Sequence, residues 1–302
     1  MKRLIGPVLI LLCTVIWGSA FVAQKLGADH FGPFAISCYR NLLAGAFLWG
    51  GVCLRNRRIG VERTNERAVY LGGTLSGIVL FAAMLTQQLG IERTTPGISA
   101  FLTANYVLFV PVLAWLVGRG RPVAGVWIGV ALALAGTYFL SFSSTPGDGL
   151  GLGAGEAWTL ACAVLFTVQI LVVDRFARAC DVLRFSMVQM FAAGLVALPF
   201  VFLPGELARA SWSGFLKGVP ALIYLGIFSS GIAYTLQNLG QARTPPALAA
   251  ILMSMESAFG AFFGWLVLGD AMTSRQLAGC GLVLAAVILS QLWPSRCEKG
   301  AA

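Results

Sequence analysis

Apolar runs of about twenty residues recur along the whole chain, and short polar segments rich in Gly and Pro separate them. Because a helix needs roughly 20 apolar residues to cross the hydrocarbon core of a bilayer, each run predicts one membrane-spanning helix. A transmembrane barrel would instead show short segments of alternating polarity. We expect ten spans, at residues 4–24, 34–54, 68–90, 97–117, 123–142, 152–174, 183–203, 218–239, 247–268 and 275–293.

The start of the chain allows a second interpretation of the first span. Lys2 and Arg3 precede a hydrophobic run, as they do in a secretory signal peptide. Ile5–Leu26 is, however, long enough to cross a bilayer, and the internal repeat described below requires this helix. We therefore expect it to be retained as a membrane span.

Composition agrees with a membrane protein and gives its orientation. Of the 302 residues, 58% are hydrophobic and only 11% are charged, whereas soluble domains carry roughly 25% charged residues. With a cytoplasmic amino terminus, 15 of the 21 Lys and Arg residues fall on the inner side, five fall outside and Arg40 lies within the second span. This bias predicts that both termini are cytoplasmic. The net charge of +9 is therefore a topology signal, and we expect no nucleic-acid partner.

The second half of the chain repeats the first at a shift of 150 residues. Gln87–Gly90 (QQLG) aligns with Gln237–Gly240 (QNLG), and Trp115–Val117 aligns with Trp265–Val267. Such self-similarity indicates a duplicated five-helix unit, which we place at residues 1–145 and 146–302. Because five is odd, the second unit enters the membrane from the opposite side. The sequence thus predicts an all-α integral membrane protein of ten transmembrane helices, arranged as two inverted repeats.

One helix carries a charge that is costly to place in a membrane. Ala247–Leu268 contains a single charged residue, Glu256, near its middle. Insertion of a charge at this depth costs roughly 2.5–3.5 kcal/mol, so we expect Glu256 to bind substrate. A structural hydrogen bond to a neighbouring Ser or Thr is the alternative. Gly260 and Gly264 follow at GxxxG spacing and are expected to let a neighbouring helix, or a substrate, approach closely.

Further polar and aromatic residues are expected around the same midplane cavity. The repeat pairs Glu256 with Tyr106 across the expected axis, although Tyr106 alone is as compatible with an ordinary helix contact. The polar candidates are individually more typical of interhelical hydrogen bonds, and Trp17 and Trp158 are equally compatible with an interfacial belt. The full set of cavity candidates is Glu256, Tyr106, Asn105, Tyr234, Gln87, Gln237, Trp17, Gln169 and Trp158.

Arg40 lies about two turns into the second span and admits three interpretations. It can extend its side chain to the interface, pair with an acidic residue, or hold a substrate carboxylate. We favour the first two.

Signals for enzymes, metals and cofactors are missing from the sequence. It has no GxSxG, HExxH or P-loop motif. The seven cysteines show no CxxC spacing, and the single histidine, His30, lies in an expected loop. We therefore expect neither an enzyme, a metal site nor a bound cofactor.

Three segments together resemble the EamA branch of the drug/metabolite transporter superfamily. They are Ile16–Gly27 (IWGSAFVAQKLG), Cys38–Gly45 (CYRNLLAG) and Leu252–Ser290, which begins LMSMESAFGAFFGW. Ser257 departs from the proline common in the family, so a kink there is not assured, and Gly269-Asp270 replaces the usual Gly-Glu. The resemblance implies two inverted repeats, no cofactor, and a cavity lined by the first, third, fourth, sixth, eighth and ninth helices. The fifth and tenth helices would lie outside it.

The function that we expect is a secondary transporter of the bacterial inner membrane that exports small metabolites, amino acids or related compounds above all. Its partners would be that substrate and the lipid bilayer, with protons as coupling ions if Glu256 is protonated during transport, and it would act as a monomer or homodimer. An exporter of amphipathic organic cations is the runner-up. A membrane scaffold without transport activity is a third hypothesis, although a scaffold has no need of a midplane carboxylate.

Overall fold

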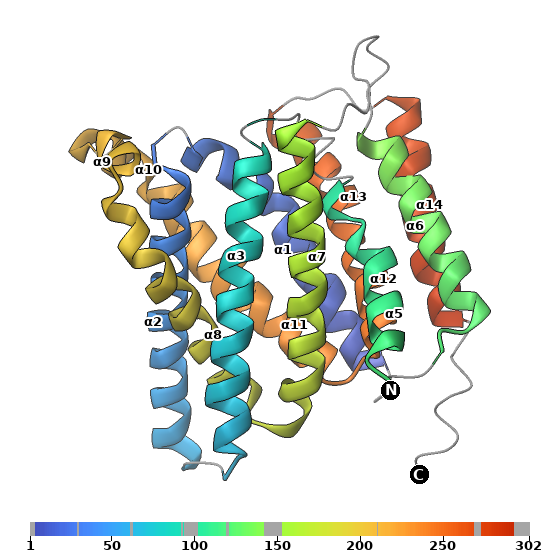
Figure 1. The fold of residues 1–302 in the computed structure, drawn as a ribbon, viewed down its shortest axis with the longest axis horizontal. Coiled ribbons are helices and arrows are strands. Elements are labelled where there is room, and N and C mark those ends of the chain that lie inside the picture. The colour runs from blue at the N-terminus through green and yellow to red at the C-terminus, as the bar shows by residue number, and fades with distance from the viewer. Residues whose placement is uncertain are drawn as a thin grey trace.

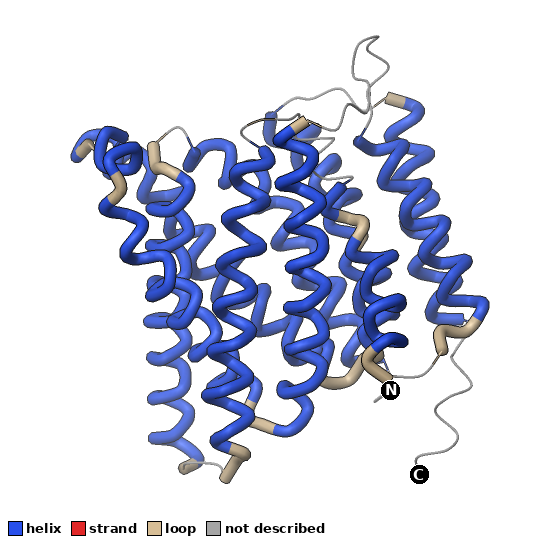
Figure 2. The backbone as a smooth tube through the Cα atoms, in the orientation of Figure 1, coloured by secondary structure: helices blue, strands red, loops and turns tan. Residues whose placement is uncertain are grey.

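The computed structural model describes residues 4–28, 30–60, 63–91, 93, 102–118, 121–141, 153–209, 211–268 and 273–292. Helices, turns and bends make up these ranges, and none of them contains a β-strand (Figure 2). The prediction of an all-helical membrane protein is confirmed at this level.

The first half of the chain is mainly helical in its described residues (Figure 1). Its elements are α1 (Ile5–Ala28), α2 (Pro33–Ile59), the π-helix η2 (Ala68–Gly72) continuing into α3 (Gly73–Ile91), α5 (Tyr106–Leu116) and α6 (Ala124–Ser141).

The second half contains more interruptions within its helices. Its elements are α7 (Ala154–Phe176), η3 (Ala177–Ala179), α8 (Val182–Ala197), η4 (Leu198–Phe202), α9 (Pro204–Arg209), α10 (Trp212–Ile223), η5 (Tyr224–Ala233), α11 (Tyr234–Gln241), α12 (Pro246–Met253), α13 (Met255–Phe263), η6 (Gly264–Leu268) and α14 (Ser274–Leu292). The elements η5 and η6 are π-helical, and η3 and η4 are 3₁₀ helices.

Six helical segments among the described residues are long and apolar enough to cross a membrane, and three shorter apolar helices accompany them. The six are 5–24, 68–90, 154–179, 182–202, 212–241 and 246–267, and the shorter ones are 106–116, 124–139 and 274–289. The 27-residue α2 falls in neither group, and its carboxyl-terminal end carries Arg55, Arg57 and Arg58. A multi-pass membrane protein follows, while the number of ten spans stays a prediction.

The packing of the helices repeats between the two halves. Helix α1 of the first half packs on α11 and α13 of the second half. In the same way, α7 of the second half packs on α3 and α5 of the first half. The helices α2 and α8 pack together, as do α6 and α14. The 150-residue shift places α1 on α7, α3 on α11 and α5 on α13, so the contacts of α1 correspond to those of α7. It also places α2 on α8 and α6 on α14, the two helices of each remaining pair. Figure 1 shows α1 and α7 running in opposite directions, with the start of α1 and the end of α14 at the same edge.

Glycines allow one of these contacts, between α1 and α13, to be close. A Cβ atom on Gly18 of α1 would overlap Phe259 and lie 2.8 Å from the backbone nitrogen of Gly260 on α13. A Cβ on Gly260 would lie 3.1 Å from the Phe21 ring. Gly260 thus lies where α1 and α13 meet, as a packing glycine would, whereas Gly264 is half-buried at the start of η6.

Carboxylates hold the two ends of the α2–α8 pair. At one end Asp181 caps α8, accepting hydrogen bonds from the backbone nitrogens of Leu183 (3.0 Å) and Arg184 (3.3 Å), and it also pairs with Arg55 of α2. At the other end Glu206 of α9 accepts from the backbone nitrogens of Phe34 (3.3 Å) and Ala35 (2.9 Å) at the start of α2. Each helix start therefore has an acidic partner, which complements its dipole.

Candidate functional site

A cavity lies between the two repeats and encloses about 830 Å³ of space free of protein atoms, the solvent at its opening included. Helices α1, α2, α3, α5, α7, η5, α11, α12 and α13 contribute to its wall, and α6 and α14 contribute none of the lining residues. The lining residues are Trp17, Gln24, Pro33, Ile36, Ser37, Arg40, Met84, Gln87, Gln88, Thr103, Tyr106, Phe166, Ile170, Ser229, Tyr234, Gln237, Met253 and Glu256. This wall matches the one implied by the family resemblance, with the second helix added.

The structure brings six of the nine predicted cavity residues together on this wall. They come from both halves of the chain, in agreement with a site between the repeats. The six are Trp17, Gln87, Tyr106, Tyr234, Gln237 and Glu256.

The other three lie elsewhere. Gln169 is fully buried behind the wall, where its Oε1 accepts from Nε2 of Gln237 at 3.4 Å. Asn105 donates its side-chain amide to the Leu102 carbonyl at 3.1 Å, so it closes a turn. Trp158 lies near the start of α7, is 42% exposed and does not line the cavity.

A break in the helix places Glu256 at the start of α13. Ser254 interrupts the helix between α12 and α13, and its hydroxyl donates to the Ile251 carbonyl at 2.6 Å. The turn at Ala104 and Asn105 lies at the equivalent position of the first repeat and precedes Tyr106. The partial positive charge at a helix start favours a carboxylate there. The helix is thus interrupted at Ser254, three residues before Ser257, the position where the sequence left a kink in doubt.

The Glu256 carboxylate has no protein partner among the described residues, where no hydrogen bond or ion pair involves it. No hydrogen bond joins it to a described Ser or Thr, the structural alternative raised from the sequence. The side chain is half-buried and lines the cavity. Its oxygens are available to a ligand or to a proton.

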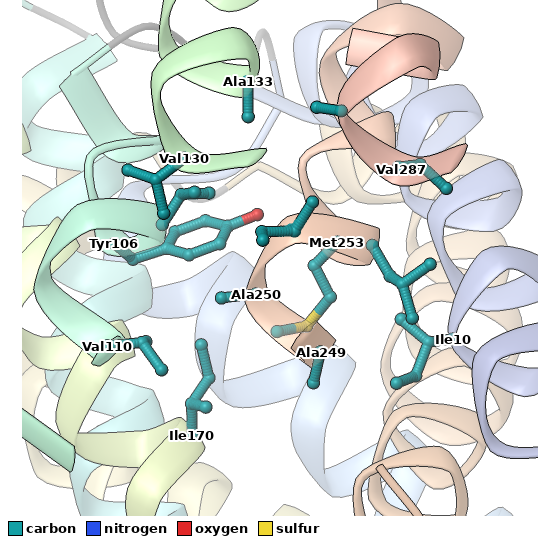
Figure 3. Packing of buried hydrophobic residues seen from close by; sticks show 14 of the residues in the cluster. Ile10, Tyr106, Val110, Val130, Ala133, Ile170, Ala249, Ala250, Met253 and Val287 are labelled. Carbon is teal, nitrogen blue, oxygen red and sulfur yellow. The ribbon is translucent and has the colours of Figure 1, made fainter. Parts of the chain in front are cut away.

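Aromatic residues form a second part of the wall. Trp17 and Tyr234 have ring centroids 4.8 Å apart with planes inclined at 58°, and Trp17 Nε1 donates to the Ser229 carbonyl at 3.1 Å. These contacts place Trp17 inside the bundle, not in an interfacial belt. Tyr106 is buried between α5, α6 and α12, with Val130, Ala250 and Met253 around its ring (Figure 3). Tyr106 and Tyr234 thus line the cavity, and both pack against apolar side chains.

The surroundings of Arg40 contradict the two interpretations favoured from the sequence, extension to the interface and pairing with an acidic residue. It is only 7% exposed, lines the cavity, and donates from Nε to Ser230 Oγ at 2.8 Å and from NH2 to Ser229 Oγ at 3.0 Å. It neither reaches the interface nor forms an ion pair within the described ranges. Sequence reasoning also did not single out Ser37, which shares the cavity-facing side of α2.

Outside the spans, the surroundings of Asp181 shift the pKa of its carboxyl group. Burial alone would raise the pKa of its carboxyl, but the Arg55 guanidinium and the α8 backbone donors outweigh this effect and lower the pKa. Arg184 pairs with Glu66 at 2.7 Å near the same end. In the described part of the chain, no cluster of three His, Cys, Asp or Glu residues has the geometry of a metal site.

Comparisons with known proteins agree with this architecture. The profile of the EamA-like transporter family matches residues 4–142 and 153–292, one match per repeat. A protein of Archaeoglobus fulgidus named an uncharacterized transporter is 28% identical over 295 residues, which cover 96% of this chain and 87% of that protein. The uncharacterized inner membrane transporter YedA of Escherichia coli K12 is 26% identical, covering 92% and 88%. A crystal structure with 20% identity has a similar fold over 96% of both chains, with a TM-score of 0.77.

Proposed function

The chain belongs to the EamA-like transporter family, and from this premise we propose that it exports small metabolites, most of all amino acids or related compounds, by secondary transport. The observation that carries the proposal is the cavity between the repeats, which contains an acidic residue without a protein partner among the described residues. Such a group inside a membrane is costly unless it serves a ligand or ion. The names of the relatives agree with a transporter and not with an enzyme.

The mechanism that we propose is alternating access. Ten spans in two inverted five-helix repeats, residues 1–145 and 146–302, would rock around the cavity and open it to one side at a time. The exchange of helix pairs between the halves supports this, because an inverted pair has two nearly equivalent packings. Both termini would be cytoplasmic in a bacterial inner membrane, in agreement with the shared edge of α1 and α14 (Figure 1).

Glu256 is the polar anchor in this proposal. Its carboxylate would bind the ammonium group of the substrate, and its protonation would release the substrate and couple export to the proton gradient. The other lining residues would fix the orientation of the substrate, with Trp17 and Tyr234 covering its apolar part.

A metabolite-export profile tests the proposal. Cells that overproduce the protein should release one or a few small metabolites faster than cells overproducing the Glu256→Gln variant at equal membrane abundance. Glu66→Gln is a matched control, because Glu66 is exposed and pairs with Arg184 away from the cavity. If the wild type and Glu256→Gln give the same profile, a metabolite exporter with this anchor is excluded and a scaffold is favoured.

An exporter of amphipathic cations is the second candidate, because the Trp17–Tyr234 pair shares the cavity with an acidic residue. A cation would bind between the aromatic faces and Glu256. Thermal stabilisation of the purified protein by quaternary amines, without stabilisation by amino acids, would select this candidate.

A further inference from the structure

Arg40 is a buried cation whose partners are neutral. Two serine hydroxyls of η5 accept its hydrogen bonds, and its side chain is 7% exposed. Burial of a guanidinium is costly unless an anion compensates it. The described residues supply no such anion, although the guanidinium lies on the wall of the cavity.

Ser37 gives an independent indication at the same place. It precedes Arg40 by three residues on α2, so both side chains lie on one face of the helix. The Ser37 side chain is 4% exposed and lines the cavity, and its hydroxyl has no hydrogen-bond partner. Buried hydroxyls are rarely left unpaired, and because this one lines the cavity, a ligand bound there would supply its missing partner.

The opposite charge lies elsewhere on the same wall. Glu256 starts α13, and α13 and α2 are not among the closely packed helix pairs. Tyr234 lies on the same cavity wall as both Arg40 and Glu256. The cavity therefore offers a cationic and an anionic group on separate helices, with an aromatic residue on the same wall.

We propose that Ser37 and Arg40 bind the carboxylate of the transported compound, whose ammonium group lies toward Glu256. This assignment rests on the proposed transport function and narrows its substrate class to amino acids and similar zwitterions. A guanidinium and a hydroxyl are donors that suit a carboxylate. Glu256 would repel the two negative charges of a dianion such as a phosphate ester. Arg40 would repel a simple cation.

The experiment compares free amino acids with their carboxamides, which keep the ammonium group and lose the carboxylate. Ligand-induced thermal shifts of the purified full chain would be measured with alanine, threonine, leucine and phenylalanine and with the four amides. The wild type should prefer an acid over its amide by roughly tenfold or more, the value of a hydrogen bond to a charged group. In Arg40→Gln this preference should disappear.

Ser37→Ala keeps the test decisive if Arg40→Gln does not fold. Because the Ser37 hydroxyl is unpaired, its removal should leave the melting temperature without ligand unchanged and weaken acid binding by about fivefold. Ser76→Ala is the matched control. Ser76 is a buried serine of α3 that accepts from Gln189 Nε2 at 2.9 Å and does not line the cavity. Its loss should lower the melting temperature and leave the preference for acids intact.

Flux of the same amino acids in liposomes separates the two proposals. If the wild type moves none of them, transport of amino acids fails, and the Ser37–Arg40 assignment fails with it. If the wild type moves them and folded Ser37→Ala and Arg40→Gln variants keep the preference for acids over amides, only the assignment is overturned.

Discussion

Acidic residues lie at helix starts in two regions of this molecule, the central cavity and the ends of the α2–α8 pair. At those ends Asp181 and Glu206 each accept two backbone hydrogen bonds, and Asp181 also pairs with Arg55. Glu256 in the cavity shares the favourable helix start but has no partner among the described residues. The comparison teaches that position on a helix is not enough to assign a role. The partners of a carboxylate separate the acids that hold the fold from the one available to a ligand.

The largest expected effect concerns ligand binding, and it tests whether Glu256 differs from the structural acids. Glu256→Gln should weaken binding of the transported amino acid by roughly ten- to a hundredfold, because a charged partner of the ammonium group is lost. The melting temperature without ligand should stay the same or rise, since no protein contact disappears. Thermal shift with and without ligand measures both. A large fall of the melting temperature without ligand would show instead that Glu256 stabilises the fold, as Asp181 and Glu206 do.

The next effect concerns the contact that holds the Glu256 helix against α1. Gly18→Ala should reduce the free energy of unfolding by about 1–3 kcal/mol, because the new Cβ overlaps Phe259 in a packed interface. Gly50→Ala on α2 is the control, since nothing lies within 4 Å of a Cβ at that position. Equal melting temperatures for the two variants would contradict the close α1–α13 approach.

A smaller loss is expected for the structural acid Glu206. Glu206→Ala should lower the free energy of unfolding by about 0.5–2 kcal/mol, the usual value of a helix cap, because the backbone donors of Phe34 and Ala35 lose their acceptor. Chemical or thermal denaturation in detergent measures the change. Binding by the folded fraction should not change, which is the reverse of the pattern predicted for Glu256→Gln.

The smallest effect is a pH dependence at Asp181. Its folded-state pKa lies below the ordinary value, so the charged form stabilises the fold above the unfolded-state pKa of about 4. This stabilisation is lost as the pH falls through the folded-state pKa. The melting temperature of the wild type should exceed that of Asp181→Asn at pH 5–7, and the difference should shrink below about pH 4. A difference that grows on acidification would contradict the ion pair with Arg55.

Much of the fold was predictable from the sequence because the bilayer imposes a simple rule. Runs of about twenty apolar residues became helices, and the shared QQLG and QNLG segments indicated the repeat that the packing reproduces. The break before Glu256 was not predictable from the sequence, because the proline common in the family is missing and the break lies at Ser254 instead.

The cavity was predictable only in part, because hydropathy does not tell which side of a helix faces inward. Trp158 and Thr159 are neighbours, yet Thr159 is fully buried and Trp158 is 42% exposed, since one residue turns a helix by about 100°. Pro33, Ile36, Ser37 and Arg40 recur at the spacing of a single helix face, and all four line the cavity. That spacing was the available signal for Arg40. Its depth in the span pointed instead to the interface.

The central claim is that the unpartnered carboxylate of Glu256 drives transport. Its most direct test is the export rate of the preferred amino acid from liposomes between pH 5.5 and 8.5, measured for wild type and Glu256→Gln with Glu66→Gln as control. The account predicts at least a tenfold loss of rate in Glu256→Gln and a residual rate that no longer depends on pH. A normal rate with the wild-type pH profile in Glu256→Gln would contradict it.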